Sequence, residues 1–152
     1  MKNYFKIFNL EEKFDINLDT LEQKYFDFQQ QFHPDRAGIS EIEKSILVNE
    51  AYEILKNPLH RASHILQLHN INIEKDKNAP KADIATLSEV LEIQEKIPEM
   101  SLQEKKNLKK QLEERIATLL QEIGLSLDNQ EFNEAAQILM RIKYFDKTLR
   151  DL

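Results

Sequence analysis

The chain has 152 residues, 32% of them charged, and its 27 acidic and 21 basic side chains give a formal net charge of −6. This length allows one domain or two small ones, and the acidic balance argues against general binding to nucleic acid. Cysteine is absent, which excludes disulfides, a cysteine nucleophile and any metal or iron–sulfur site built on thiolates of this chain.

The chain shows no apolar run long enough to span a membrane and no signal-peptide pattern at its N-terminus, so we expect a soluble, cytoplasmic protein. Turn-forming residues are scarce, with two glycines and four prolines in the whole chain. Because β-hairpins depend on such residues, we predict an all-α fold.

Four helices are predicted in the N-terminal half. A short one over residues 3–10 is too small to be stable alone and must dock on its neighbours. The next, over about 20–32, starts with a capping box formed by Asp19 and Glu22. Its core face consists of residues at spacings of three and four, namely Leu21, Tyr25, Phe28 and Phe32.

The third helix is predicted over about 41–56 with Ser40 as its cap, and the fourth opens with Asn57 as the cap and Pro58 in the first helical position. The apolar face expected for the third helix consists of Ile42, Ile46, Leu47, Ala51, Ile54 and Leu55. In the fourth helix, Ala62, Ile65, Leu66 and His69 are expected to face inward.

A polar turn, Phe32-His33-Pro34-Asp35-Arg36, joins the second and third helices. Helices joined by a short loop lie antiparallel, which puts this turn at the exposed tip of a helical hairpin. Pro34 ends the helix before it, and a helix C-terminus favours a cation such as His33. Asp35 gains nothing from that dipole and caps no helix, so it is either an ordinary turn residue or a binding residue.

Two histidines in the fourth helix, His60 and His64, have the spacing of zinc-binding helices. Arg61 stands where such motifs carry a glutamate, and no third ligand is evident. We therefore expect ordinary surface or boundary histidines and no metal site.

The C-terminal half follows a polar linker rich in Asn, Lys and Asp. We predict domains at 1–72 and 83–152 with the linker at 73–82. Three helices are expected at about 83–97, 102–127 and 129–150, and they form a three-helix bundle. Capping boxes open the last two at Ser101 and Asp128, and Gly124 allows a bend in the middle one.

The first helix of this bundle has two apolar stripes. One consists of Val90, Ile93 and Ile97, and the other of Ile84, Leu87 and Leu91 beside Ser88, Glu92 and Glu95. One stripe must face the bundle, whereas the other either packs on the N-terminal half or stays exposed as a binding surface. The core stripe of the last helix consists of Phe132, Ala135, Ala136, Leu139 and Ile142, and Tyr144 lies off it as a candidate anchor.

His33-Pro34-Asp35 between two such helices resembles the J-domain of DnaJ-type co-chaperones. Other segments narrow the resemblance to HscB, the J-protein of bacterial iron–sulfur cluster assembly, over residues 3–150. These segments are Tyr4-Phe5 with Phe8 and Leu10, Asn49-Glu50-Ala51-Tyr52-Glu53-Ile54-Leu55, Asn57-Pro58-Leu59-His60-Arg61-Ala62, Leu91-Glu92 and Asp146-Lys147.

The resemblance implies a co-chaperone with no catalytic activity and no cofactor of its own. Its chaperone-binding residues would be His33, Pro34, Asp35, Arg36 and Lys24, which would contact an HscA- or DnaK-type chaperone and stimulate its ATP hydrolysis. The IscU-type cluster scaffold would be bound by Leu87, Ser88, Leu91, Glu92, Glu95 and Tyr144.

Two features depart from that family. Ser88 stands where a bulkier apolar residue is common, and the helix before the tripeptide carries Lys24 as its only basic residue. Two rival functions remain open. A general J-protein with other clients would keep the tripeptide but would not bind IscU, and a metal-dependent hydrolase would need His33, Asp35, His60 and His64 to converge.

Overall fold

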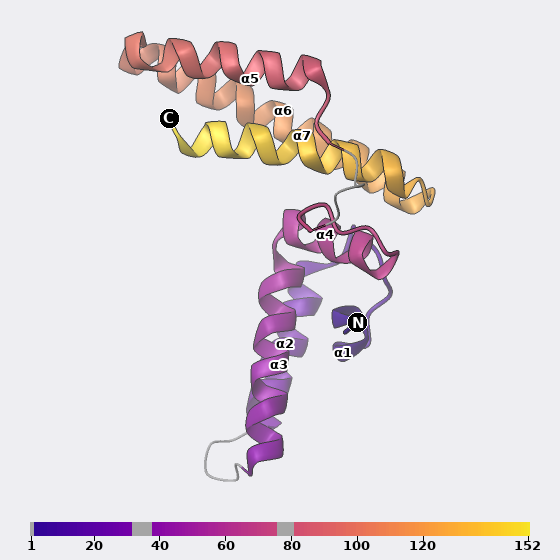
Figure 1. Cartoon of the computed structure of the whole chain (residues 1–152). Helices are drawn as coiled ribbons and strands as arrows, with labels where there is room; N and C mark the ends of the chain where they lie inside the picture. The colour runs from indigo at the N-terminus through magenta and orange to yellow at the C-terminus, as the bar shows by residue number, and fades with distance from the viewer. Residues whose placement is uncertain (1, 32–37, 76–80) are drawn as a thin grey trace. The chain divides into compact units, whose positions relative to one another are not determined.

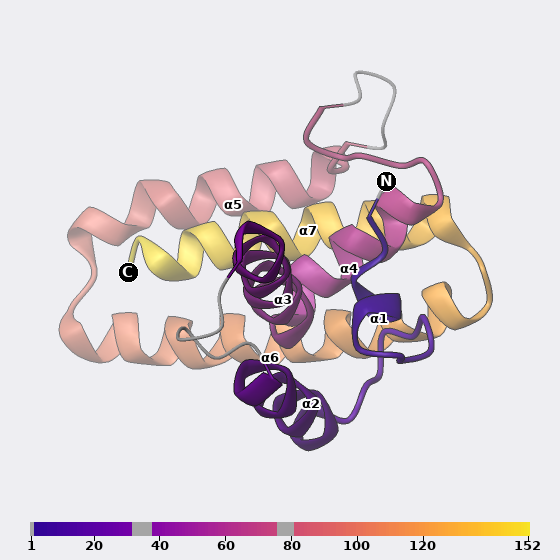
Figure 2. The same ribbon diagram turned by 90° about the horizontal axis from the view of Figure 1, so that it is seen from below.

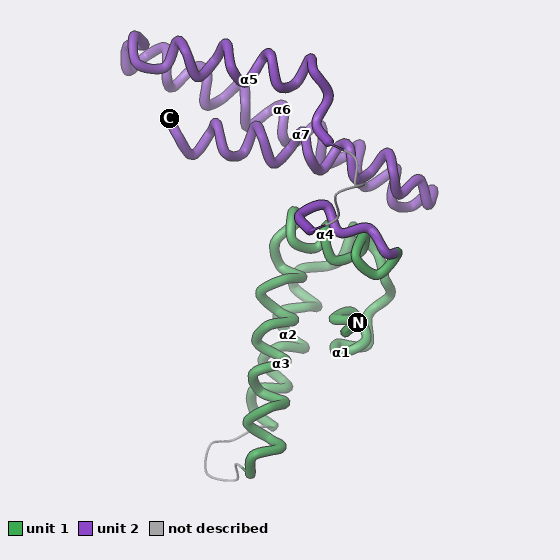
Figure 3. Tube along the Cα trace, viewed as in Figure 1, with its two compact units in different colours: residues 1–69 green, residues 70–152 purple. Residues whose placement is uncertain are grey.

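The computed structural model describes residues 2–31, 38–75 and 81–152. These ranges form helices joined by turns and contain no strand, which confirms the predicted all-α class (Figure 1). The chain divides into two compact units, Met1–His69 and Asn70–Leu152 (Figure 3). Each unit has a hydrophobic core of its own.

The N-terminal unit contains α1 (Tyr4–Ile7), α2 (Leu18–Gln31), α3 (Ile39–Lys56) and α4 (Pro58–Leu68). Helices α2 and α3 lie side by side as a hairpin, and both α1 and α4 pack against α3 (Figures 1 and 2). The docking of the short first helix is therefore confirmed. The core of this unit includes Phe5, Phe8, Phe14, Leu21, Val48, Ala51, Leu55, Ala62, Ile65 and Leu66.

Helix starts in this unit agree only in part with the capping patterns. The Asn57 side chain caps α4, accepting hydrogen bonds from the backbone N–H groups of Leu59 at 2.9 Å and His60 at 3.2 Å, as predicted. For α2 the prediction that Asp19 caps the helix is wrong, because the Asn17 side chain accepts a hydrogen bond from the backbone N–H of Thr20 at 3.1 Å.

For α3 the prediction that Ser40 is the N-cap is also wrong. The helix begins at Ile39 with Gly38 as its N-cap, and no side chain caps it. The Gly38 carbonyl already accepts from the backbone N–H groups of Glu41 and Ile42, so Ser40 lies inside the first turn.

The apolar face of α3 also differs from the prediction. Ile42 and Ile46 are exposed, whereas Val48, Ala51 and Leu55 are buried. At 100° per residue, Ile42 and Ile46 lie about 120° and about 160° from Val48, so the three residues cannot share one face. In α4, His69 is exposed rather than inward-facing, and His64 is buried rather than on the surface.

The C-terminal unit contains α5 (Ile84–Lys96), a 3-10 turn η2 (Ile97–Glu99), α6 (Leu102–Asp128) and α7 (Phe132–Arg150). Helix α6 packs against α7, and α5 packs against α7 and runs in the same direction as it does (Figure 1). The core includes Val90, Leu112, Leu119, Ile123, Leu127, Ala135, Ala136, Ile138, Leu139, Ile142 and Phe145. Residues before the gap at 76–80 belong with this unit, because Lys143 on α7 forms an ion pair with Glu74 at 2.8 Å.

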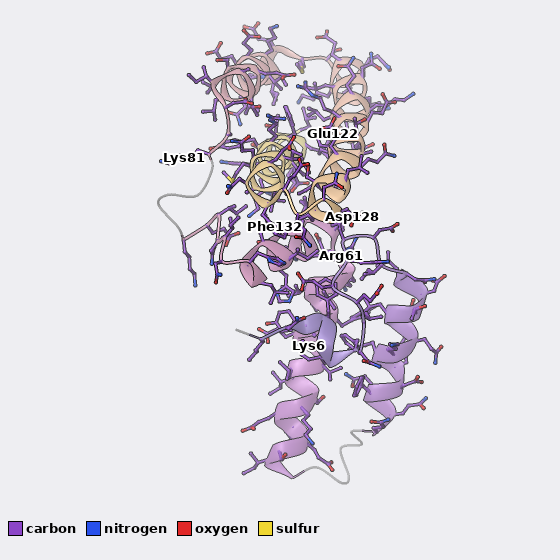
Figure 4. The ribbon with its side chains drawn as sticks, turned by 90° about the vertical axis from the view of Figure 1, so that its right-hand side faces the viewer. Lys6, Arg61, Lys81, Glu122, Asp128 and Phe132 are labelled. Atoms are coloured by element: carbon purple, nitrogen blue, oxygen red, sulfur yellow. The ribbon has the colours of Figure 1, made fainter. Side chains whose placement is uncertain are left out.

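Capping in this unit was predicted correctly at one of two places. Ser101 caps α6, since its Oγ accepts from the backbone N–H of Glu104 at 3.1 Å. Asp128 is instead the last residue of α6, and α7 begins at Phe132 without a side-chain cap (Figure 4). The chain reverses through Gln130, whose φ is 60°. Helix α6 continues through Gly124, so the bend allowed for there does not interrupt it.

Candidate functional site

The tripeptide segment lies between the two helices of the hairpin in the sequence. His33, Pro34, Asp35 and Arg36 lie outside the described residues. On either side of them, α2 ends at Gln31 and α3 begins at Ile39, and the two helices pack against each other. Residues 32–37 therefore connect the ends of two paired helices.

Polar and aromatic contacts fix α2 against α3. Oδ1 of Asn49 accepts hydrogen bonds from the Tyr25 hydroxyl and from Nε2 of Gln29, each at 2.7 Å. The Tyr25 ring also stacks on the Tyr52 ring with centroids 4.1 Å apart. These contacts set the register of the two helices and so the relative position of the ends that carry the turn.

Lys24 is engaged within its own unit. Its Nζ donates to the carbonyl of Phe8 at 2.9 Å and lies 3.4 Å from the carbonyl of Asn9, at the C-terminal end of α1. A cation there satisfies free carbonyls and complements the helix dipole. The predicted chaperone contact of Lys24 thus has to coexist with a structural role.

His64 holds α1 against α4. Its Nε2 accepts a hydrogen bond from the backbone N–H of Tyr4 at 3.1 Å, and its ring stacks on those of Tyr4 and Phe5. Burial lowers the pKa of His64, with a smaller opposing effect from Glu12, so the neutral imidazole is favoured. His60 is exposed, so the two histidines do not form a pair of ligands.

Arg61, labelled in Figure 4, is also a structural residue. Its Nη1 donates to the Leu55 carbonyl at 2.8 Å, and its guanidinium lies 4.9 Å from the centre of the Phe14 ring. Burial lowers the pKa of Arg61, opposed by Asp15. Within residues 2–31, 38–75 and 81–152, no cluster of three or more histidine, cysteine or acidic side chains could hold a metal ion.

On α5, one of the two predicted stripes faces the bundle and the other does not. Val90 is buried, as is Thr86, whereas Leu91 is 59% exposed and Ile84 is 82% exposed. Leu87 is half-buried between these extremes. The remaining predicted positions on α5, Ser88, Glu92 and Glu95, are exposed. Helices α6 and α7 therefore leave the second stripe largely uncovered.

An ion pair shows which flank of α7 meets α5. Arg141 on α7 bonds to Asp83, the N-cap of α5, at 3.1 Å. Hydrogen bonds from Thr86, and then the charge of Arg141, lower the pKa of Asp83 and keep it ionised. Asp83 was not among the predicted capping residues, although Asp is a preferred N-cap residue.

Tyr144 and Leu87 lie on the two flanks joined by this ion pair. Tyr144 follows Arg141 by three residues and Leu87 follows Asp83 by four, so each lies within about 60° of the paired side chain on its helix. Because α5 and α7 run in the same direction, both positions lie about one turn beyond the pair (Figure 1). The half-buried Tyr144 ring is thus placed on the side of α7 next to the exposed stripe of α5.

A cavity of about 660 Å³ opens elsewhere in the bundle, among residues that include Asp83, Glu89, Arg115, Arg141 and Phe145. Two ion pairs lie in its lining, Arg141 with Asp83 and Arg115 with Glu89. The Arg115 guanidinium also lies 4.6 Å from the centre of the Phe145 ring. These ion pairs join α5 and its N-cap to α6 and α7.

No helix in the described part of the chain combines the length and the apolar character needed to cross a bilayer.

Comparison with known proteins relates this chain to co-chaperones. A family model described as the HSCB C-terminal oligomerisation domain matches residues 82–152. The iron-sulfur cluster co-chaperone protein HscB homolog of Arabidopsis thaliana is 28% identical over 158 residues, which cover 99% of this chain. The chain spans 62% of the length of that relative.

Solved structures match over both units. The human co-chaperone protein HscB has a TM-score of 0.88 and 26% identity, covering 99% of this chain and 80% of the other. The Jac1 co-chaperone of Saccharomyces cerevisiae has a TM-score of 0.84 and 26% identity, with coverage of 100% and 94%. The chaperone HscB from Vibrio cholerae, at 23% identity and a TM-score of 0.83, has the same fold.

Proposed function

We propose that the chain is a member of the HscB family and a co-chaperone of iron–sulfur cluster assembly, because the HSCB C-terminal model matches residues 82–152 and solved HscB and Jac1 structures match over both units. In this proposal the C-terminal unit binds an IscU-type scaffold, and the N-terminal unit brings it to an HscA- or DnaK-type chaperone and stimulates ATP hydrolysis. The chain contains no cysteine, so it offers no thiolate ligand to the cluster.

The observation that carries the proposal is the uncovered face of α5 beside Tyr144. We call this face the α5–α7 surface, and it consists of Leu87, Ser88, Leu91, Glu92, Glu95 and Tyr144. It combines apolar side chains and one aromatic ring with two carboxylates at its edge. Protein interfaces commonly have this composition, with an apolar and aromatic centre inside a polar rim.

The tripeptide would act on the ATPase partner rather than on a substrate. Pro34 would restrict the turn, and the Asp35 carboxylate would accept hydrogen bonds from an arginine of the partner, a pairing that favours two-pronged geometry. His33 would orient the turn and add polar contacts. Arg36 and Lys24 would complete this contact with their positive charges.

The scaffold half of the proposal can be tested by calorimetric titration of IscU with wild type and with Leu91→Ser. Removing one exposed apolar anchor should weaken binding about tenfold. Leu102→Ser is the matched control, because Leu102 is 80% exposed but lies on α6 outside the α5–α7 surface.

Wild-type affinity in Leu91→Ser would contradict the assignment of this surface. If wild type itself shows no saturable binding to IscU, the chain is better described as a general J-protein with other clients.

A further inference from the structure

A second uncovered apolar face lies on the hairpin of the N-terminal unit. It consists of Phe26 on α2 and Ile39, Ile42 and Ile46 on α3, which are 51%, 79%, 50% and 62% exposed. We call it the hairpin apolar face. On α3 the three isoleucines fall within about 60° of one another and between about 120° and about 180° from the buried residues Val48, Ala51 and Leu55.

Contacts between the helices place Phe26 on the same side as the isoleucines. Gln29 on α2 donates a hydrogen bond to Asn49 on α3 at 2.7 Å, so these two residues lie where α2 and α3 contact each other. Phe26 lies about 60° from Gln29, and Ile42 and Ile46 lie about 20° and about 60° from Asn49.

The core lies on the other side of the hairpin, where α1 packs. Phe28 contacts Phe8, just after α1, with ring centroids 5.8 Å apart. On α2, Phe28 lies about 160° around the helix from Phe26. The hairpin apolar face is therefore turned away from the core of its own unit, and Figure 2 shows the hairpin nearly end-on with α1 to one side.

Single exposed apolar residues are ordinary, but four on one face of a two-helix hairpin are not. The isoleucines add nothing to the core, and a β-branched residue is a poor choice for an exposed helical position on propensity alone. A binding partner would account for them.

Position and charge indicate which partner. The three isoleucines begin at the first residue of α3, at the end of the hairpin joined by residues 32–37, and Ile39 follows Arg36 by three residues. Helix α2 carries three carboxylates and one cation, Lys24, whose ammonium is bonded to carbonyls at the end of α1. Beyond Lys24, charge on α2 therefore adds no attraction for an acidic partner that engages the turn, whereas apolar contact is available.

We propose that the hairpin apolar face is a second part of the chaperone contact, covered by an apolar patch of the same ATPase chaperone while it engages the tripeptide. This inference rests on the proposed function. In this inference the tripeptide triggers ATP hydrolysis, and the hairpin apolar face increases the affinity for the chaperone.

The test is steady-state ATP hydrolysis by the matched HscA-type chaperone, titrated with wild type and with the double variant Ile42→Ser/Ile46→Ser. The concentration for half-maximal stimulation should rise about tenfold, with the maximal rate retained at saturation. Phe26→Ser, on the other helix, should shift it in the same direction. Leu102→Ser/Leu125→Ser is the matched control, since both leucines are highly exposed on α6, and it should behave as wild type.

If wild type stimulates and the double variant has the same half-maximal concentration, the inference is overturned while the proposed function stands. If wild type does not stimulate at all, both fail. Size-exclusion chromatography with light scattering tests whether a second copy of the chain covers this face instead. If wild type is a dimer and the double variant is a monomer, a second copy covers the face and the inference is overturned.

Discussion

At the scale of single residues, His64 has a structural role in the N-terminal unit that its position in the sequence does not indicate. The spacing from His60 points to a ligand pair, but its ring is packed among the aromatic residues of α1 and its Nε2 accepts from the Tyr4 backbone. This acceptor role requires the neutral imidazole, because a protonated ring has no lone pair to offer.

Stability of the N-terminal unit should therefore fall on acidification. The pKa of His64 is lower in the folded than in the unfolded chain, where it is about 6.5, so the unfolded state binds the proton first. The stabilisation is fully present above that pH and is lost as pH falls toward the folded pKa. Urea unfolding at pH 7.5, 6.5 and 5.5 measures this decline.

Two variants separate His64 from the other titrating groups. His64→Phe should be less stable at pH 7.5 and should lose part of the decline, whereas His60→Gln should keep the decline intact because His60 is exposed. An identical pH dependence in His64→Phe and wild type would show that His64 is not responsible.

Ser88 is the residue of the α5–α7 surface that departs from the HscB pattern that this sequence resembles. It is exposed beside Leu87 and Leu91, so a larger apolar side chain there would extend the contact rather than disturb the core. Ser88→Met should tighten IscU binding about threefold to tenfold by calorimetry, whereas Ser88→Ala should change little. Weaker binding in Ser88→Met would mean that the scaffold approaches this position too closely for a long side chain.

At the scale of helices, capping patterns were poorer guides than apolar periodicity. Ser40 and Ser101 both precede a helical segment with an acidic residue nearby, but only Ser101 is bonded to a free backbone N–H of its helix. Helix α3 begins at Ile39, and the Gly38 carbonyl accepts from the backbone N–H groups of Glu41 and Ile42, so Ser40 lies inside the first turn.

Ser101→Ala should therefore lower the free energy of unfolding by about 1 kcal/mol, whereas Ser40→Ala should change it by no more than a few tenths. The pair removes the same hydroxyl group at two helix starts, so side-chain chemistry is matched. Urea unfolding followed by circular dichroism measures both. Equal losses in the two variants would contradict the capping assignment.

Periodicity predicted the presence of the long helices well because burial of one face repeats every three or four residues. It misjudged α3, where Ile42 and Ile46 obey the same spacing on the opposite face. Spacing alone does not say whether an apolar face is covered by the fold or by a partner.

The site was predictable to different degrees. The two apolar stripes on α5 could be predicted from the sequence, but whether the second stripe is covered was left open, and α6 and α7 do not cover it. The pairing of Asp83 with Arg141 joins residues 58 positions apart, and no local pattern could reveal it. The positions that resemble family contacts were identified by resemblance, and their roles remain predictions.

At the scale of the whole molecule, two units with separate cores should allow the two proposed binding activities to be separated by mutation. The α5–α7 surface lies entirely in one unit, and the tripeptide and the hairpin apolar face lie in the other. Substitutions in one unit should leave the binding activity of the other intact. Asp35→Asn should thus bind IscU as wild type does while losing its effect on the chaperone.

The most direct measurement is steady-state ATP hydrolysis by the matched HscA-type chaperone in the presence of IscU, with wild type, His33→Gln or Asp35→Asn added. The proposed function predicts that wild type raises the rate and that neither variant does so at any concentration. An unchanged rate with wild type, or equal stimulation by Asp35→Asn, would contradict the proposal that this chain acts through its tripeptide on an ATPase chaperone.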